Sequence, residues 1–281
     1  MSTETAKEVL AAWETSSQYW TKHQSLIASM FVPLTDALVD AAHIGPGQSV
    51  LDVGGGSGEP SLTIAAIVGQ SGSVTYTDPS AGMVKAARDE ADRRGLTNIR
   101  FHQCSAEQLP FPDNAFDGAV SRLAAMFFPD PTAGLREILR VIKPGASLSF
   151  LVWAGKEVNP FFQIIIEILR KFIPVEAEDE DAPAAFRFAT PGKLARLLID
   201  AGATSVTERI LNFKIEAPIT PARFWELRTE MSDTFRSKLA QLEVDQVTLI
   251  REAVQRAVAV YFETGAMSFP AQAVIVSGQK H

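Results

Sequence analysis

The sequence predicts an α/β protein built on a doubly wound sheet. Short apolar runs of strand length alternate with segments in which apolar residues recur every three or four positions. This alternation is typical of a largely parallel sheet covered by helices. The first run, residues 49–53, ends in a glycine-rich turn, and the second, residues 74–78, ends in an aspartate. Ligands of such sheets bind beyond the carboxyl ends of the strands, where both features are expected to lie.

The composition excludes several classes of protein. The chain has 281 residues, of which 46% are hydrophobic and 21% charged, as in an ordinary globular protein with a sizeable core. One cysteine allows neither an intrachain disulfide nor a multi-cysteine zinc site, so we expect a reducing, cytoplasmic environment. No signal pattern or membrane-spanning run is recognised. The net charge of −7, with scattered basic residues, argues against a nucleic-acid partner.

The order of the elements predicts seven strands and a single domain, 1–281. Residues 4–43 should be helical, with Pro33 at a helix start or break. They form either a cover for the ligand, 1–43, or padding on one face of the sheet. Two helical insertions, 155–189 and 218–266, are expected to form a lid. The strands are expected at 49–53, 74–78, 99–102, 116–121, 147–153, 205–213 and 271–276, and the helices at 62–68, 80–94, 132–139, 160–173, 190–201, 224–235 and 247–261, the last with Asp245 as its N-cap.

The spacing of the glycines separates two cofactor classes. Gly54, Gly56 and Gly58 alternate with other residues, and Glu59 stands where a dinucleotide fingerprint requires its third glycine. This disfavours a nicotinamide cofactor. The glycines, which include Gly55, permit positive φ and let a ligand approach the main chain. The run from Val50 to Gly58 instead resembles the first motif of class I S-adenosylmethionine (SAM) methyltransferases.

The resemblance implies a Rossmann-like methyltransferase fold, with the last strand antiparallel, and a SAM site. SAM carries no phosphate, and Asp52 could help to hold its cationic end, directly or through water. Asp78 is placed to accept hydrogen bonds from both ribose hydroxyls. Pro79 follows it, and Met83 resembles the position that packs near the adenine, or else packs in the core. At the switch point of the sheet, Ser121 and Arg122 should border the reacting methyl group.

Residues 104–113 resemble a stretch of the methyltransferases of ubiquinone and menaquinone biosynthesis. The acidic residue that commonly accepts the adenine amino group there is replaced by Ser105. A hydroxyl accepts this bond without charge assistance, so the backbone of Ala106 and Glu107 is an alternative. Cys104 is expected to be a packed thiol rather than a nucleophile.

Few residues qualify as a catalytic base. His23 lies in the N-terminal cover beside Tyr19 and Trp20, which are expected to contact the cofactor, and it is the candidate that could face the pocket; a surface position is the alternative. His43, His102 and Tyr261 are weaker candidates, with Glu59 and Arg122 as orienting groups. We expect no metal site, because the acidic run 176–181 is typical of a solvated loop.

Together these features predict a SAM-dependent methyltransferase that acts on a small, largely apolar metabolite, at oxygen or carbon. Methyl transfer from a sulfonium needs alignment and water exclusion more than charge stabilisation. The alternatives are a SAM-binding regulatory protein without turnover, favoured by Ser105 and the shortage of bases, and a nicotinamide-dependent oxidoreductase.

Overall fold

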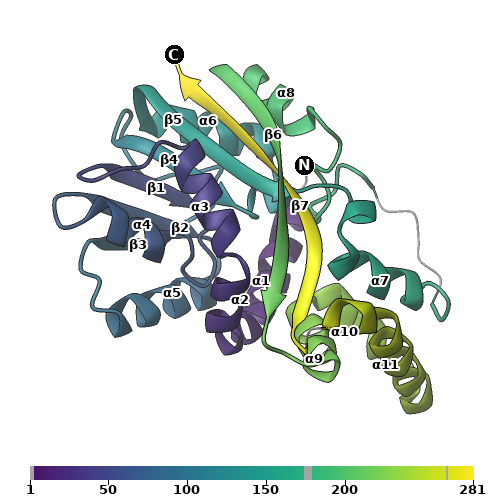
Figure 1. The fold of residues 1–281 in the computed structure, drawn as a ribbon. Helices are drawn as coiled ribbons and strands as arrows, with labels where there is room; N and C mark the ends of the chain where they lie inside the picture. Colours follow the sequence, from purple (N-terminus) through teal and green to yellow (C-terminus); the bar gives the residue numbers. More distant parts are fainter. Residues whose placement is uncertain (1–2, 174–178, 264) are drawn as a thin grey trace.

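A seven-stranded mixed sheet forms the centre of the computed structural model, which describes residues 3–173, 179–263 and 265–281 (Figure 1). The strands lie in the order β3-β2-β1-β4-β5-β7-β6. β7 runs antiparallel to both neighbours, whereas the other adjacent pairs are parallel. This confirms the predicted mixed sheet with an antiparallel last strand. The strands are β1 (Ser49–Val53), β2 (Ser73–Asp78), β3 (Ile99–Gln103), β4 (Phe116–Arg122), β5 (Ile142–Trp153), β6 (Ala203–Ala217) and β7 (Met267–Lys280).

Helices pack against the sheet and gather at one end of the molecule. α3 packs on β4 and β5, α4 and α5 pack on β2, and α6 packs on β5. α7, α9, α10 and α11 lie together at the end that β6 and β7 reach (Figure 1). The helices are α1 (Thr3–Lys22), α2 (Gln24–Met30), α3 (Val32–Ala41), α4 (Ser61–Val68), α5 (Ala81–Arg93), α6 (Pro131–Val141), α7 (Pro160–Leu169), α8 (Lys193–Asp200), α9 (Pro221–Met231), α10 (Asp233–Leu239) and α11 (Val244–Val258), with short 3-10 helices η1 (Ala125–Phe127), η2 (Lys156–Val158) and η3 (Ala259–Phe262).

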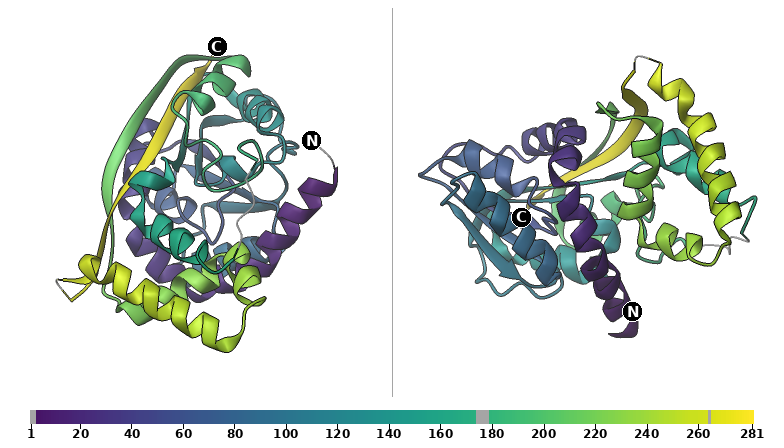
Figure 2. Two further views of the ribbon diagram at one scale, coloured as in Figure 1. Left: turned by 90° about the vertical axis from the view of Figure 1, so that its right-hand side faces the viewer. Right: turned by 90° about the horizontal axis from the view of Figure 1, so that it is seen from below.

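β6 and β7 are longer than the sequence predicts. They pair with each other from Ala203 to Ala217, but β5 follows β7 only as far as Ala273. The remainder is a two-stranded ribbon that extends past the sheet and carries the inserted helices (Figures 1 and 2). The sequence did not predict this part because its polar residues and Pro270 interrupt the apolar run that was used to recognise strands. A ribbon with water on one side needs no continuous apolar run.

Several predicted helices differ from the structure in their bounds, and the predicted helix 224–235 is divided into α9 and α10 at Ser232. The helical region 4–43 is divided into α1, α2 and α3, with Pro33 in the first turn of α3, where a missing N–H costs nothing. α7 ends at Leu169 rather than at residue 173. Glu243, not Asp245, caps α11, because its side chain and that of Gln246 form a reciprocal capping box. The predicted acidic loop 176–181 lies partly outside the described residues.

β1 lies in the middle of the core. Val50 and Leu51 are fully buried, and β2 and β4 flank the strand on either side. A strand buried on both faces must be apolar throughout. The polar Asp52 and the glycines after Val53 therefore stand out, and a cavity lies at the carboxyl end of this strand.

Candidate cofactor-binding site

A cavity of about 470 Å³ lies beyond the carboxyl ends of β1, β2 and β4. Its size falls within the usual range for small-molecule sites. One side consists of the glycine loop, the tip of β2 and the loop after β3. The opposite side consists of α1, α2 and the segment after β4. The wall comprises Ala6, Lys7, Val9, Leu10, Trp13, Trp20, Ile27, Phe31, Val53–Ser57, Glu59, Asp78, Pro79, Met83, Cys104–Glu107, Arg122–Ala124 and Phe127–Pro129.

The glycine loop combines close packing with one open position. Gly54 has φ +75°, and a Cβ on it would lie 2.4 Å from the Cβ of Ala124. Gly56 has φ +54°, and a Cβ on it would meet no atom within 4 Å. Gly54 is therefore required by the protein's own packing. Gly56 leaves free space at the cavity wall, which suits close approach of a ligand to the main chain.

Asp78 is held rigidly at the tip of β2. Its Oδ2 accepts a hydrogen bond from the Gly56 N–H at 3.1 Å, and its Oδ1 accepts one from the Ser80 N–H at 2.9 Å. Burial raises its pKa to about 6, against the opposing effect of these two bonds, so the carboxylate is mostly ionised at neutral pH. Each carboxylate oxygen can accept more than one bond. Asp78 therefore retains capacity to accept bonds from a ligand's hydroxyls.

α1 closes the cavity through contacts with the first turn of α5. The carboxylate of Glu14 accepts hydrogen bonds from Ser80 Oγ at 2.6 Å and from the Gly82 N–H at 3.1 Å. A carboxylate at a helix N-terminus also interacts favourably with the helix dipole. Ser17 lies so close to Gly82 that a Cβ there would be 2.3 Å from Ser17 Oγ. α1 is thus seated on α5 immediately beside Asp78.

The far side of the cavity is aromatic and aliphatic. Trp13 packs edge-on against Phe127, with ring centroids 4.9 Å apart, and its ring centroid is 5.8 Å from that of Trp20. The buried Nε1 of Trp20 has no hydrogen-bond partner among the described residues. A buried N–H without a partner is costly. A ligand acceptor atom in this cavity would satisfy it.

Arg122 supplies a positive charge at the end of β4. Its guanidinium donates to Thr35 Oγ1 at 2.8 Å and to the backbone oxygen of Glu59 at 3.0 Å. Burial lowers its pKa, but an arginine remains charged in proteins. Fixed by α3 and the glycine loop, it presents a cation to the cavity at the switch point of the sheet.

Most of the predicted cofactor residues line this cavity. Cys104 lines it too, and burial raises the pKa of its thiol to about 11, so it is not a thiolate at neutral pH. The predicted residues in the wall are Trp20, Gly54, Gly55, Gly56, Asp78, Pro79, Met83, Ser105, Ala106, Glu107 and Arg122.

Four predicted cofactor residues do not reach the cavity. Asp52 is fully buried beneath the loop, where its Oδ2 accepts from Ser61 Oγ at 2.6 Å. Gly58 packs on Leu62, and Ser121 is fully buried. The ring of Tyr19 lies under the guanidinium of Arg236, 4.5 Å away, on the side of α1 that faces the inserted helices. These predictions rested on position in a motif, at a strand end or on a helix, whereas the direction of the side chain decides whether it reaches the cavity.

His23 does not face the cavity either. Its side chain is 1% exposed, with Nε2 2.5 Å from Glu230 Oε2 and Nδ1 3.3 Å from Arg223 Nη2. It therefore joins the N-terminal helices to α9 instead of reaching the wall. Among the weaker candidates, His102 packs edge-on against Phe111, and Tyr261 stacks on Phe269. No histidine of the described residues lines the cavity.

The sequence reasoning missed Trp13, Glu14, Phe31 and Phe127. Trp13 and Trp20 are seven residues apart, which is two helical turns and places both on one face of α1. That spacing was a usable signal for the cavity wall. Nothing in the sequence pairs Glu14 with Ser80, because the contact joins residues 66 positions apart.

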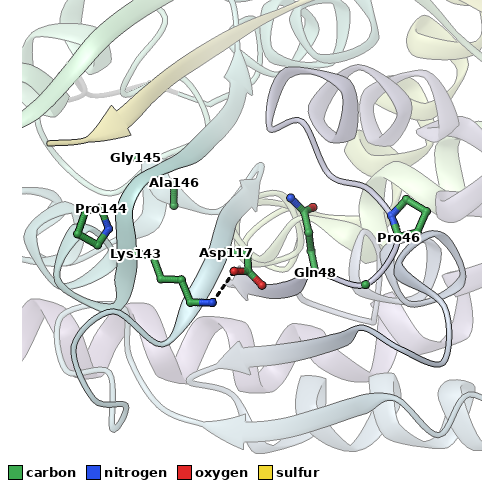
Figure 3. A pocket seen from close by; sticks show the side chains of 8 residues that line it. Pro46, Gln48, Asp117, Lys143, Pro144, Gly145 and Ala146 are labelled. Atoms are coloured by element: carbon green, nitrogen blue, oxygen red, sulfur yellow. Dashed lines mark hydrogen bonds and ion pairs between the residues drawn. The ribbon is translucent and has the colours of Figure 1, made fainter.

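A second hollow, of about 490 Å³, lies at the opposite, amino edge of the sheet (Figure 3). It is lined by Pro46, Gln48 and residues 143–146, and the ammonium of Lys143 is paired with Asp117 Oδ1 at 2.6 Å. Parallel sheets bind their ligands at the other edge. Within the described ranges no three metal-binding side chains cluster, and no described helix is both long and apolar enough to cross a membrane.

The central part of the chain is similar to known methyltransferases. A family model described as a methyltransferase domain matches residues 51–150. The matched region is less than half of the chain, and it resembles a methyltransferase domain. The methyltransferase match begins in β1 and ends in β5, so it contains the glycine loop, Asp78, Ser105 and Arg122.

Relatives of the methyltransferase domain include the ubiquinone/menaquinone biosynthesis C-methyltransferase UbiE of Stenotrophomonas maltophilia, 37% identical over 51% of this chain and 59% of the relative. The chain spans only about half to three fifths of the curated relatives it matches. The YcgJ protein of Bacillus subtilis (TM-score 0.58, 20% identity, 88% of this chain and 97% of that one) shares the fold. So does a Haemonchus contortus phosphoethanolamine N-methyltransferase in complex with SAM (0.54, 16%, 94% and 58%).

Proposed function

We propose that this protein is a SAM-dependent methyltransferase that methylates a small, largely apolar acceptor at oxygen or carbon. The observation that carries the proposal is the cavity at the switch point, which joins a polar side holding Gly56 and Asp78 to an apolar side built by α1, α2 and the segment after β4. The Haemonchus contortus neighbour, which contains SAM, supports the choice of cofactor. We further propose a cytoplasmic protein whose partner is the acceptor itself.

The wall residues divide into groups by the part of SAM that each would hold. Asp78 would accept from the ribose hydroxyls, as a carboxylate in this position does in nucleoside-binding folds. Met83 and residues 105–107 would border the adenine, with Ser105 as a neutral acceptor. Arg122 and the glycine loop would hold the amino-acid portion, because a guanidinium pairs well with a carboxylate. The open space at Gly56 fits this assignment.

When bound, SAM supplies an electrophilic methyl group. The contribution of the chain is to align the acceptor and exclude water, for which Trp20, Phe31 and Leu123 supply an apolar wall. Glu59 is already engaged, since its carboxylate accepts from Thr63 Oγ1 at 2.7 Å and from Arg94 at 3.0 Å. With no histidine in the described wall, an acceptor that ionises easily, such as a phenol or an activated carbon, suits the site.

Two measurements test the proposal and its rivals. Calorimetric titration with SAM, S-adenosylhomocysteine and reduced NAD should show micromolar binding of the first two and none of the third. Transfer of labelled methyl from SAM across a panel of phenols, enols and amines should then show turnover with an apolar phenol or carbon acid. Binding without turnover on every acceptor would favour the regulatory alternative, and preferential binding of reduced NAD would favour the oxidoreductase.

A further inference from the structure

β6 is the last strand of the sheet, and its outer edge has no neighbouring strand among the described residues. It runs for 15 residues, whereas β3, the strand at the opposite edge of the sheet, runs for five. In the left view of Figure 2, β6 follows the outside of the molecule. The N–H and C=O groups along an unpaired edge can bond to a strand of another chain. This long edge is therefore a candidate interface.

The solvent side of β6 carries an apolar side chain between an acid and a base. Ile210 is 57% exposed, although it lies in the middle of the strand. Neither Glu208 nor Lys214 forms an ion pair within 4.0 Å among the described residues. Because alternate residues of a strand share a face, these three side chains lie on the same side of β6. An exposed isoleucine flanked by two charges without ionic partners suits contact with a surface that carries the same groups in reverse order.

A second copy of β6, turned by a two-fold rotation, presents the same groups in reverse order. When two identical strands pair antiparallel and Leu211 faces Leu211 of the second copy, Glu208 faces the partner's Lys214. The symmetry repeats this pair, so the interface contains it twice. Ile210 then lies diagonally across from the partner's Ile210, within reach of an apolar contact. Directly opposed acid and base side chains stabilise an antiparallel pair.

The charges of β6 disfavour several other symmetric registers. A register centred on Arg209 or on Lys214 would place that residue opposite its own copy, and one centred on Asn212 would place Glu208 opposite the partner's Glu216. Like charges that face each other across two strands are destabilising. Among registers centred on residues 206–214, the one centred on Leu211 brings an acid opposite a base. The charge pattern therefore selects a single alignment.

We propose that this protein forms a symmetric dimer through antiparallel pairing of β6 with β6 of a second copy, in the register centred on Leu211. The regular part of the pairing runs from Thr207 to Ile215, about 30 Å in length. The irregularity of β6 between Thr204 and Thr207 lies at its end. Each copy has one such edge, so the association closes at two chains. The inference does not depend on the proposed methyltransferase activity.

Sedimentation velocity of the full chain tests for the dimer. A single strand pair is a small interface, so we expect a concentration-dependent equilibrium in which the dimer predominates at about 100 µM protein. A monomer throughout the range from about 1 to 200 µM would overturn the proposal and leave the edge of β6 to solvent or to a different partner.

Charge reversal tests the register. Glu208→Lys and Lys214→Glu each place like charges opposite each other twice, so we expect each to raise the Kd of its own dimer about tenfold or more. In an equimolar mixture of the two variants, the lysines of one chain face the glutamates of the other. The Kd of this mixed dimer should return to within about threefold of the wild type. Failure of the two folded variants to associate would overturn the register.

Glu216→Lys is the matched control. It makes the same charge change on the same face of β6, but in the proposed register it faces the uncharged Val206, so the Kd should change by less than about threefold. A loss equal to that of Glu208→Lys would assign the effect to net charge and contradict the pairing. Circular dichroism monitors folding, because Glu208→Lys also removes the acceptor of the Gly192 N–H. An unchanged dimer in both Glu208→Lys and Lys214→Glu would place the interface elsewhere.

Discussion

The carboxylate of Asp78 accepts a hydrogen bond from the backbone N–H of Gly56 over 3.1 Å, which joins the tip of β2 to the loop after β1. Tyr76, also on β2, donates from its hydroxyl to the backbone oxygen of Gly56 at 2.5 Å. The open position of the loop is thus held from both its N–H and its C=O by one neighbouring strand. A loop fixed in this way is formed before the ligand arrives, which lowers the entropic cost of binding.

Replacing the Asp78 carboxylate should weaken cofactor binding. Asp78→Asn keeps the shape but removes the charge, and its amide NH₂ would face one of the two backbone donors now bound, Gly56 or Ser80. We expect the Kd for S-adenosylhomocysteine to rise about 10- to 100-fold. Calorimetric titration measures it, with Asp89→Asn, an exposed carboxylate on α5, as the control. Unchanged affinity in Asp78→Asn would remove Asp78 from the site.

Two glycines of the loop should respond differently to alanine. Gly56→Ala places a methyl group in open space, so we expect a loss of about 1–2 kcal/mol of unfolding free energy from its positive φ. It should also produce a clear loss of cofactor affinity. Gly54→Ala must displace Ala124 as well, so its loss should reach about 3 kcal/mol or more. Urea unfolding compares the two. A larger loss of unfolding free energy in Gly56→Ala than in Gly54→Ala would mean that Gly56 is the packed position.

Substitutions should disrupt, and then restore, the contact between Ser17 on α1 and Gly82 on α5. Gly82→Ala puts a Cβ 2.3 Å from Ser17 Oγ and 2.7 Å from Ser17 Cβ, so α1 has to move away from Asp78. We expect faster hydrogen exchange in residues 3–22 and weaker cofactor binding, by about threefold to tenfold. The double variant Gly82→Ala/Ser17→Gly removes both close atoms and should recover most of the affinity. Absence of recovery would show that α1 is not held by this contact.

Asp52 should make the stability of the protein depend on pH. Its folded pKa, raised by burial to about 7 from 3.8, means that the folded state holds this proton more tightly than the unfolded chain. The unfolding free energy attributable to Asp52 therefore falls as pH rises from about 4 to 7, by at most about 4 kcal/mol. Asp52→Asn stays neutral, so its stability relative to the wild type should increase over that range.

Urea unfolding of the wild type and Asp52→Asn at pH 4.5, 6 and 8 measures this dependence. Asp89→Asn, exposed on α5, serves as the control for removing a carboxylate elsewhere. A constant difference between wild type and Asp52→Asn at all three values would contradict the assignment. The effect is a property of folding, because Asp52 lies beneath the loop and bonds to Ser61 rather than to the cavity.

Short sequence motifs predicted the part of the site whose residues lie close together in the chain. The loop from Gly54 to Gly58 follows its strand directly, and Asp78 ends the next strand, so strand order alone brings them to one edge. The sequence could not predict the direction of His23, since that depends on Glu230 and Arg223, about 200 residues away. Tyr19 was misplaced for the same reason. A helix shows which residues share a face, but not which neighbour that face meets.

The sequence by itself determined the seven-stranded α/β sheet, the glycine loop and the acid at the tip of β2, because each follows from a short run of residues whose backbone preference does not depend on distant partners. Tertiary structure alone decided that α1 closes the cavity through Glu14, that His23 joins α9, and that Arg228 lies between Phe161 and Phe162. These contacts join residues far apart in the chain. Packing between helices decides them, and no local sequence pattern indicates which partner a side chain will meet.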